Sequence, residues 1–150
     1  MREPKAATGI GSGFRAQPWN GNQMEQRKRI VYVEDEADLR WLVKHILESA
    51  GGFDVLVCAS GAEALLRIRE FDPDLVLLDV MMPQMDGVEV LRSLRAEAET
   101  ASVPVVFLTA RTEHALEYLA LGALGVIAKP FEPRALLAQV REYAGEPVAA

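Results

Sequence analysis

Short apolar runs alternate with amphipathic segments between residues 30 and 143. The runs contain few polar residues, a pattern typical of strands that are buried on both faces of a parallel sheet. They cover residues 30–33, 53–58, 75–78, 105–109 and 126–128. In the segments that follow them, apolar residues recur at gaps of three and four. This spacing predicts helices that bury one face.

The regular alternation of five strands with five helices predicts an α/β fold. Such a (βα)5 chain forms a parallel sheet with right-handed crossovers and helices on both faces, which is a three-layer, doubly wound architecture. We expect Ser60 to cap a helix over residues 61–70 and Gly87 to open the next one. In the helix at 113–121, Leu116, Leu119 and Ala120 are expected to form the inner face.

Residues 1–28 differ from the rest of the chain because they are rich in glycine and show no apolar period. They are predicted to be a flexible tail, followed by one domain over residues 29–144 and a frayed end at 145–150. Half of the 150 residues are hydrophobic, which is enough for a single domain with a full core.

Composition and charge exclude several classes of function. The net charge of −6 argues against a nucleic-acid surface, where a basic patch is expected. No apolar run approaches the ~20 residues that cross a bilayer. Because the N-terminus has no apolar signal-peptide core, we expect a cytoplasmic protein without a membrane partner. Cys58 is the only cysteine, so an internal disulfide and a cysteine metal cluster are excluded.

Chemically active side chains stand where the predicted strands end. Glu34 and Asp35 follow the first strand, Asp79 the third and Lys129 the fifth, while Thr109 ends the fourth. Parallel strands bring these groups to one edge of the sheet, where open α/β sheets bind ligands. Clustered carboxylates repel one another unless a cation joins them, and Mg²⁺ suits an all-oxygen site that also contacts phosphate. The set therefore indicates a site for a phosphoryl group.

Four segments resemble the receiver domain of two-component response regulators. They are VYVEDE at 31–36, LLDVMMPQMDG at 77–87, FLTA at 107–110 and AKPF at 128–131. Together they span most of the predicted domain, and their order and spacing are specific as a set. The resemblance implies a flavodoxin-like strand order, 2-1-3-4-5. It also implies a signalling protein that assists its own phosphorylation and dephosphorylation and is not an enzyme.

The resemblance assigns a role to each group at this edge. Asp79 would accept a phosphoryl group from a sensor histidine kinase or a histidine phosphotransfer protein. Glu34 and Asp35 would form the acidic pair, and Mg²⁺ would be held by Asp35, Asp79 and the backbone carbonyl of Met81. The remaining expected features are a phosphoryl contact and activation shift at Thr109, a phosphoryl ion pair at Lys129, and a cis peptide bond between Lys129 and Pro130.

One position departs from the pattern of the family. Val126 stands where related receivers commonly carry a Tyr or Phe that swings inward on activation. Val126 therefore holds the position of the family's switch residue without an aromatic ring, and its simpler role is to complete the strand. Met81 and Arg111 occupy positions that often tune dephosphorylation in the family.

Other functions fit the sequence less well. A phosphatase of the haloacid dehalogenase type would need a second acid two residues after Asp79, where this chain has Met81. A dinucleotide enzyme would need a glycine-rich turn after the first strand. The alternative that stays open is a phosphate-independent interaction module on the same fold, although such modules usually lack part of the acid, Thr and Lys set.

The sequence after Tyr143 leads us to expect a single-domain receiver with no output domain. Its unknown downstream target would then dock on the receiver itself. The expected docking face combines the fourth helix, the fifth strand and the fifth helix, and includes His114, Glu117, Tyr118 and Val126.

Overall fold

A computed structural model describes residues 27–145. Most of the predicted tail at 1–28 and of the predicted frayed end at 145–150 therefore lies outside the described residues. Across the described part of the chain, no helix has the length and apolar character needed to span a membrane.

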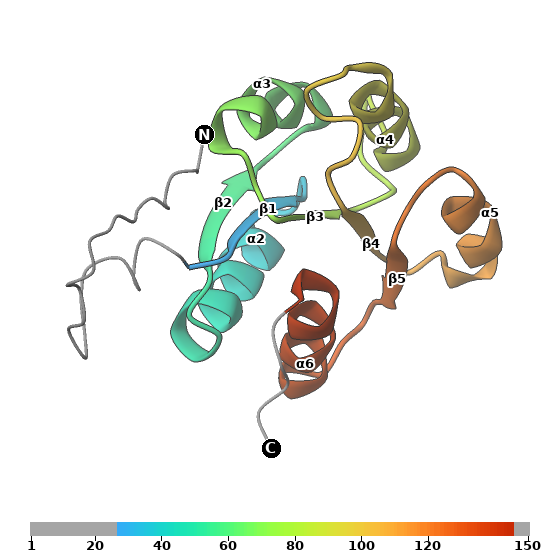
Figure 1. Ribbon diagram of the computed structural model, residues 1–150. Helices are drawn as coiled ribbons and strands as arrows, with labels where there is room; N and C mark the ends of the chain where they lie inside the picture. Colours follow the sequence, from blue (N-terminus) through green and yellow to red (C-terminus); the bar gives the residue numbers. More distant parts are fainter. Residues whose placement is uncertain (1–26, 146–150) are drawn as a thin grey trace, which may run out of the picture.

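The sheet has five parallel strands in the order β2-β1-β3-β4-β5, which confirms the predicted topology (Figure 1). The strands are β1 (Arg29–Val33), β2 (Asp54–Cys58), β3 (Leu75–Leu78), β4 (Val105–Thr109) and β5 (Gly125–Ala128). β3 and β4 begin and end as predicted, whereas the starts of β1, β2 and β5 differ by one residue. The parallel run of all five strands brings their carboxyl ends to one edge.

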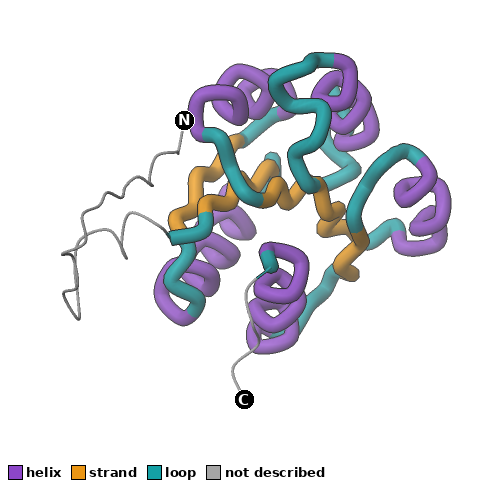
Figure 2. The backbone as a smooth tube through the Cα atoms, viewed as in Figure 1, coloured by secondary structure: helices purple, strands orange, loops and turns teal. Residues whose placement is uncertain are grey.

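Helices cover both faces of the sheet. They are α2 (Ala37–His45), which continues as a π-helical turn at Ile46–Ala50, then α3 (Gly61–Phe71), α4 (Gly87–Ala96), α5 (Ala115–Ala120) and α6 (Pro133–Ala144). A short 3-10 turn, Thr112–His114, leads into α5. α2 and α6 lie on one face, and α3, α4 and α5 lie on the other (Figures 1 and 2). The three-layer prediction is therefore confirmed.

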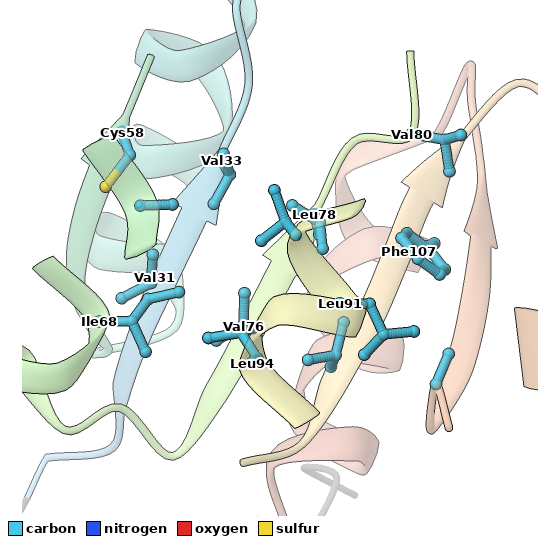
Figure 3. Packing of buried hydrophobic residues seen from close by; sticks show 14 of the residues in the cluster. Val31, Val33, Cys58, Ile68, Val76, Leu78, Val80, Leu91, Leu94 and Phe107 are labelled. Carbon is cyan, nitrogen blue, oxygen red and sulfur yellow. The ribbon is translucent and has the colours of Figure 1, made fainter. Parts of the chain in front are cut away.

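Each face of the sheet has its own apolar core, which explains why the strands lack polar alternation. Val31 and Val33 of β1 lie on the side of the sheet that α3 and α4 cover, in one apolar cluster with Ile68 and Leu91 (Figure 3). Because side chains alternate along a strand, Ile30 and Tyr32 belong to the opposite core with α2 and α6. β1 is therefore buried on both faces up to Val33, the residue before the acidic pair.

Polar caps set the starts of α3 and α4. The Ser60 side chain accepts a hydrogen bond from the Glu63 backbone N–H at 3.1 Å, which confirms its predicted capping role. Asp86 caps α4 in the same way, through the Glu89 N–H at 2.9 Å. The capped start of α4 lies against the end of β3, because a Cβ added at Gly87 would collide with the Asp79 backbone carbonyl oxygen. This contact holds the start of α4 against the backbone of Asp79.

The predicted inner face of α5 is wrong. Leu116 is 82% exposed and Leu119 is 43% exposed, and Ala120 is exposed as well. The buried residue is Tyr118, whose ring lies 4.8 Å from that of Phe107 in β4. α5 has only six residues and turns one large side chain, Tyr118, toward the sheet.

Candidate functional site

The carboxyl edge of the sheet gathers the side chains that the sequence placed there. In the register, Val33 stands beside Leu78, Leu78 beside Phe107, and Thr109 beside Ala128. Glu34, Asp79 and Lys129 each follow a strand at this edge, and Thr109 ends β4. The site therefore draws on four adjacent strands, and its geometry depends directly on the pairing of the sheet.

Three carboxylates form the centre of the site. One oxygen from each of Glu34, Asp35 and Asp79 lies within 4.8 Å of the other two. Glu34 is only 2% exposed and Asp79 is 5% exposed, whereas Asp35 is open to solvent. The cluster thus has two buried carboxylates and one that faces solvent. This arrangement concentrates negative charge where water is scarce.

Lys129 is the cation of this cluster. Its Nζ lies 2.8 Å from Glu34 Oε1 and 3.5 Å from Asp79 Oδ2, and its side chain is 17% exposed. The ammonium therefore pairs more closely with Glu34 than with Asp79. The peptide bond between Lys129 and Pro130 is cis, as the resemblance led us to expect.

Burial and the nearby Glu34 carboxylate raise the pKa of Asp79 from 3.8 to about 6. Lys129 and the Met81 backbone N–H act in the opposite direction, and the N–H donates to Asp79 Oδ1 at 3.3 Å. Desolvation disfavours a charged carboxylate, and a like charge disfavours it further. Without a metal, folding therefore increases the affinity of Asp79 for a proton.

This shift predicts a pH-dependent cost in stability. The folded-state pKa of Asp79 lies above its unfolded value, so its proton favours folding below about pH 4, and that advantage is lost as the pH rises to about 6. In metal-free protein at pH 7, Asp79→Asn should stabilise the fold by up to about 3 kcal/mol. At pH 4 the variant and the wild type should be nearly equal. Urea unfolding in the presence of a chelator measures both differences, and a pH-independent difference would contradict the assignment.

Glu34 has a further partner that the sequence analysis missed. The Tyr32 hydroxyl donates to Glu34 Oε1 at 3.0 Å, and the Glu36 backbone N–H lies 3.2 Å from Oε2. The Arg40 guanidinium also donates to the Glu34 carbonyl at 2.8 Å. The available signal was the hydroxyl of Tyr32, which stands in β1 two residues before an acid that directly follows the strand.

Thr109 and Met81 occupy the loops beside Asp79. Thr109 is fully buried, and its Oγ1 accepts a hydrogen bond from the Arg111 backbone N–H at 3.0 Å. The Arg111 guanidinium approaches the sulfur of Met81 at 3.6 Å, and Met81 is 56% exposed. Val126 lies in β5, half-buried against the core beneath α3, α4 and α5. The loops after β3 and β4 therefore contact each other through Met81, which is itself hydrogen-bonded to Asp79.

A pocket of about 350 Å³ adjoins Lys129. Its lining is mostly apolar and comes from α2 and the loops that follow β4 and β5: Leu39, Leu42, Ala110, Lys129, Pro130 and Phe131. The side chain of Lys129 thus links the acidic cluster to an apolar hollow next to α2.

The expected docking face differs from the prediction at Tyr118. This residue is only 5% exposed because its ring packs on Phe107, so it contributes little surface. Glu117 is exposed, and its carboxylate lies 3.0 Å from Nδ1 of the half-buried His114. Leu116 and Leu119 of α5, which were predicted to be buried, are exposed instead, and Leu124 just before β5 is exposed as well.

The family model described as "Response regulator receiver domain" matches residues 30–141. The match covers most of the chain and all of the site described above, so the chain belongs to the receiver domain family of response regulators. Along 117 residues the chain is 45% identical to the DNA-binding response regulator MtrA of Mycolicibacterium paratuberculosis. That alignment covers 77% of this chain and 50% of MtrA, so the chain spans about half the length of this relative.

Solved structures show the same fold. The chemotaxis protein CheY4 of Vibrio cholerae is 33% identical, with a TM-score of 0.73, and the match covers 78% of this chain and 98% of CheY4. The receiver domain of the sensor histidine kinase PA1611 from Pseudomonas aeruginosa is 27% identical, with a TM-score of 0.71. That match covers 80% of this chain and 99% of the other, whose structure holds a magnesium ion in its active site cleft.

Proposed function

We propose that this receiver domain accepts a phosphoryl group on Asp79 and that the phosphorylated state carries the signal. The observation that supports this most directly is the position of Asp79, a buried carboxylate within 3.5 Å of the Lys129 ammonium and beside two further acids. A carboxylate in this position can act as a nucleophile, and the nearby ammonium can neutralise the negative charge of the phosphoryl oxygens.

In the proposed reaction, an Asp79 carboxylate oxygen attacks the phosphorus of the donor. A bond forms between this oxygen and phosphorus, the bond from phosphorus to the donor breaks, and its electron pair remains with the donor. The product is an acyl phosphate. Catalysis then consists of alignment and of neutralising charge on the phosphoryl oxygens. Lys129 would pair with one such oxygen, and Thr109 would donate its hydroxyl hydrogen to another.

The residues present fit a Mg²⁺ ion. Every candidate ligand is an oxygen, and three carboxylates share the site with a single ammonium, which leaves negative charge for a divalent cation to balance. We propose that Asp35, Asp79 and the Met81 carbonyl hold the ion. When bound, Mg²⁺ supplies positive charge to the phosphoryl oxygens. The magnesium ion in the cleft of the PA1611 receiver supports this assignment.

The phosphoryl donor would be a sensor histidine kinase or a histidine phosphotransfer protein, the class of partner that receiver domains use. Phosphorylation adds roughly −1.5 to −2 charge next to Thr109 and Lys129. We propose that both side chains shift toward it and carry the change to β5 and α5, where Val126 replaces the usual aromatic residue. A downstream protein would then read the face of α5, β5 and α6, including the exposed Leu116 and Leu119.

MtrA is a DNA-binding response regulator, and this chain aligns with half of it. Whether this protein acts as a single domain is a separate question. Intact mass of the protein isolated from its native cells tests it: a mass matching the 150-residue chain agrees with single-domain action, whereas a larger product with a nucleic-acid-binding region would overturn it.

Dependence on Mg²⁺ and Asp35 tests the proposed chemistry. With a small-molecule phosphodonor and Mg²⁺, intact mass should rise by one phosphoryl group, and a chelator should abolish the gain. Asp35→Asn removes a charged ligand from a site with few protein ligands and should slow incorporation by about 100-fold, on the scale expected for a charge-stabilising group. Asp38→Asn, an exposed acid three residues further on, is the matched control and should react normally. Equal rates in both variants would remove Asp35 from the metal site. A chain that gains no phosphoryl group at all would point to the phosphate-independent module.

A further inference from the structure

The Tyr32 hydroxyl is a polar group inside an apolar core, and its hydrogen bond leads directly to the site. Tyr32 has no exposed surface and packs within the core between the sheet and α2 and α6. From there its hydroxyl donates to Glu34 Oε1 at 3.0 Å. Tyr32 lies in β1 and Glu34 is the residue that directly follows this strand, so the two side chains are only two positions apart.

One oxygen of Glu34 serves two donors. Oε1 accepts from Tyr32 and also lies 2.8 Å from Lys129 Nζ, whereas Lys129 is 3.5 Å from Asp79. In this structure the Lys129 ammonium is therefore hydrogen-bonded to Glu34 and lies farther from Asp79. A phosphoryl group on Asp79 would draw the ammonium toward its own oxygens and loosen the contact with Glu34. A buried carboxylate that loses a donor pays a desolvation penalty unless another donor stays in place.

We propose that Tyr32 is a positioning residue that keeps Glu34 hydrogen-bonded while Lys129 moves from Glu34 to the phosphoryl group on Asp79. The hydroxyl lowers the cost of releasing Lys129 and so favours the phosphorylated geometry. This inference rests on the proposed function, since it concerns the movement of Lys129 toward a phosphorylated Asp79.

The surroundings of Tyr32 fit this role. Burial and the negative charge of Glu34 raise the pKa of the Tyr32 hydroxyl far above its ordinary value, so the group keeps the hydrogen that it donates. Its ring is enclosed by a core that does not include Lys129, so the packing that positions the hydroxyl does not depend on Lys129. The Glu36 backbone N–H donates to the other oxygen of Glu34, Oε2. When Lys129 leaves, Tyr32 is therefore the donor that remains at Oε1.

Tyr32→Phe tests the proposal because it removes the hydroxyl and keeps the ring. The probe is the beryllium trifluoride anion, added with Mg²⁺, because this anion mimics the phosphoryl group on a carboxylate. The side-chain NMR signal of Lys129 reports the movement of the ammonium from Glu34 to the bound anion. Loss of a hydrogen bond to a charged group should raise the anion concentration at half-saturation by about 10-fold. Tyr143→Phe is the matched control. Its hydroxyl lies against Gly125, at the other end of β5 from Lys129, and this variant should match the wild type.

A double-mutant cycle separates positioning from a general effect on structure. If Tyr32 acts through Glu34, then Tyr32→Phe should change half-saturation by less than about twofold in a Glu34→Gln background. An unchanged affinity in Tyr32→Phe alone, or an equal loss in both backgrounds, would overturn the role of Tyr32 and leave the proposed function standing. A wild-type protein that neither binds the anion nor gains a phosphoryl group would overturn both.

Discussion

Gly87→Ala is expected to destabilise the domain by about 3 kcal/mol, in the range for an overpacked site. A Cβ at this position would collide with the Asp79 carbonyl oxygen and would lie 2.9 Å from the Val80 Cα. Both are backbone atoms, so no side-chain rotation can relieve the contact. The start of α4 would have to move away from the end of β3, and the Asp79 backbone would move with it.

Gly61→Ala is the matched control, since Gly61 and Gly87 each follow the capping residue of a helix. A Cβ at Gly61 would meet Val90 Cγ2 at 2.7 Å and the Met85 side chain at 3.0 Å, groups that can shift. Its loss of stability should therefore be smaller, and urea unfolding of the two variants gives the comparison. Equal losses of stability in the two variants would mean that the backbone contact between α4 and Asp79 relaxes at no greater cost than the side-chain contacts at Gly61.

Asp79→Asn should abolish phosphoryl incorporation, with a loss of at least about 100-fold in the rate from a small-molecule donor. A neutral amide lacks the nucleophilic oxygen of a carboxylate, and the acyl phosphate cannot form on it. The variant should still fold, because the replacement keeps the shape of the side chain and removes a buried charge. Asp38→Asn, an exposed acid on α2, controls for the loss of one negative charge. Incorporation by Asp79→Asn at the wild-type rate would place the acceptor elsewhere.

The strands and the edge that holds the site followed directly from the sequence. The run Leu75–Leu78 ends at Asp79 because a strand covered on both faces tolerates only apolar residues, and the first acid therefore marks its exit from the sheet. The alternation of elements predicted parallel strands, which in turn placed Glu34, Asp79 and Lys129 together. The order of the strands came from the family resemblance and not from the apolar pattern.

Local sequence patterns did not predict the contacts between side chains of different helices, strands and loops. In the sequence, Tyr32 was only one more large residue in a predicted strand. Its hydrogen bond to Glu34 depends on how the ring packs in the core, which the sequence pattern does not show. The spacing of Leu116 and Leu119 suited a buried face, yet Tyr118 is the residue of α5 that packs on Phe107, and both leucines are exposed. Such features depend on which side chain fills a given space, and periodicity carries no information about that.

Locating the phosphoryl group on the wild-type chain tests the central claim most directly. Borohydride reduces an acyl phosphate on Asp to homoserine, so treatment after phosphorylation with Mg²⁺ leaves a stable mark at the acceptor. Peptide mass spectrometry should find homoserine at position 79, with Asp35 and Asp86 unmodified. Homoserine at another aspartate, or an acid-stable phosphate on a serine or threonine, would contradict the assignment of Asp79 as the phosphoacceptor.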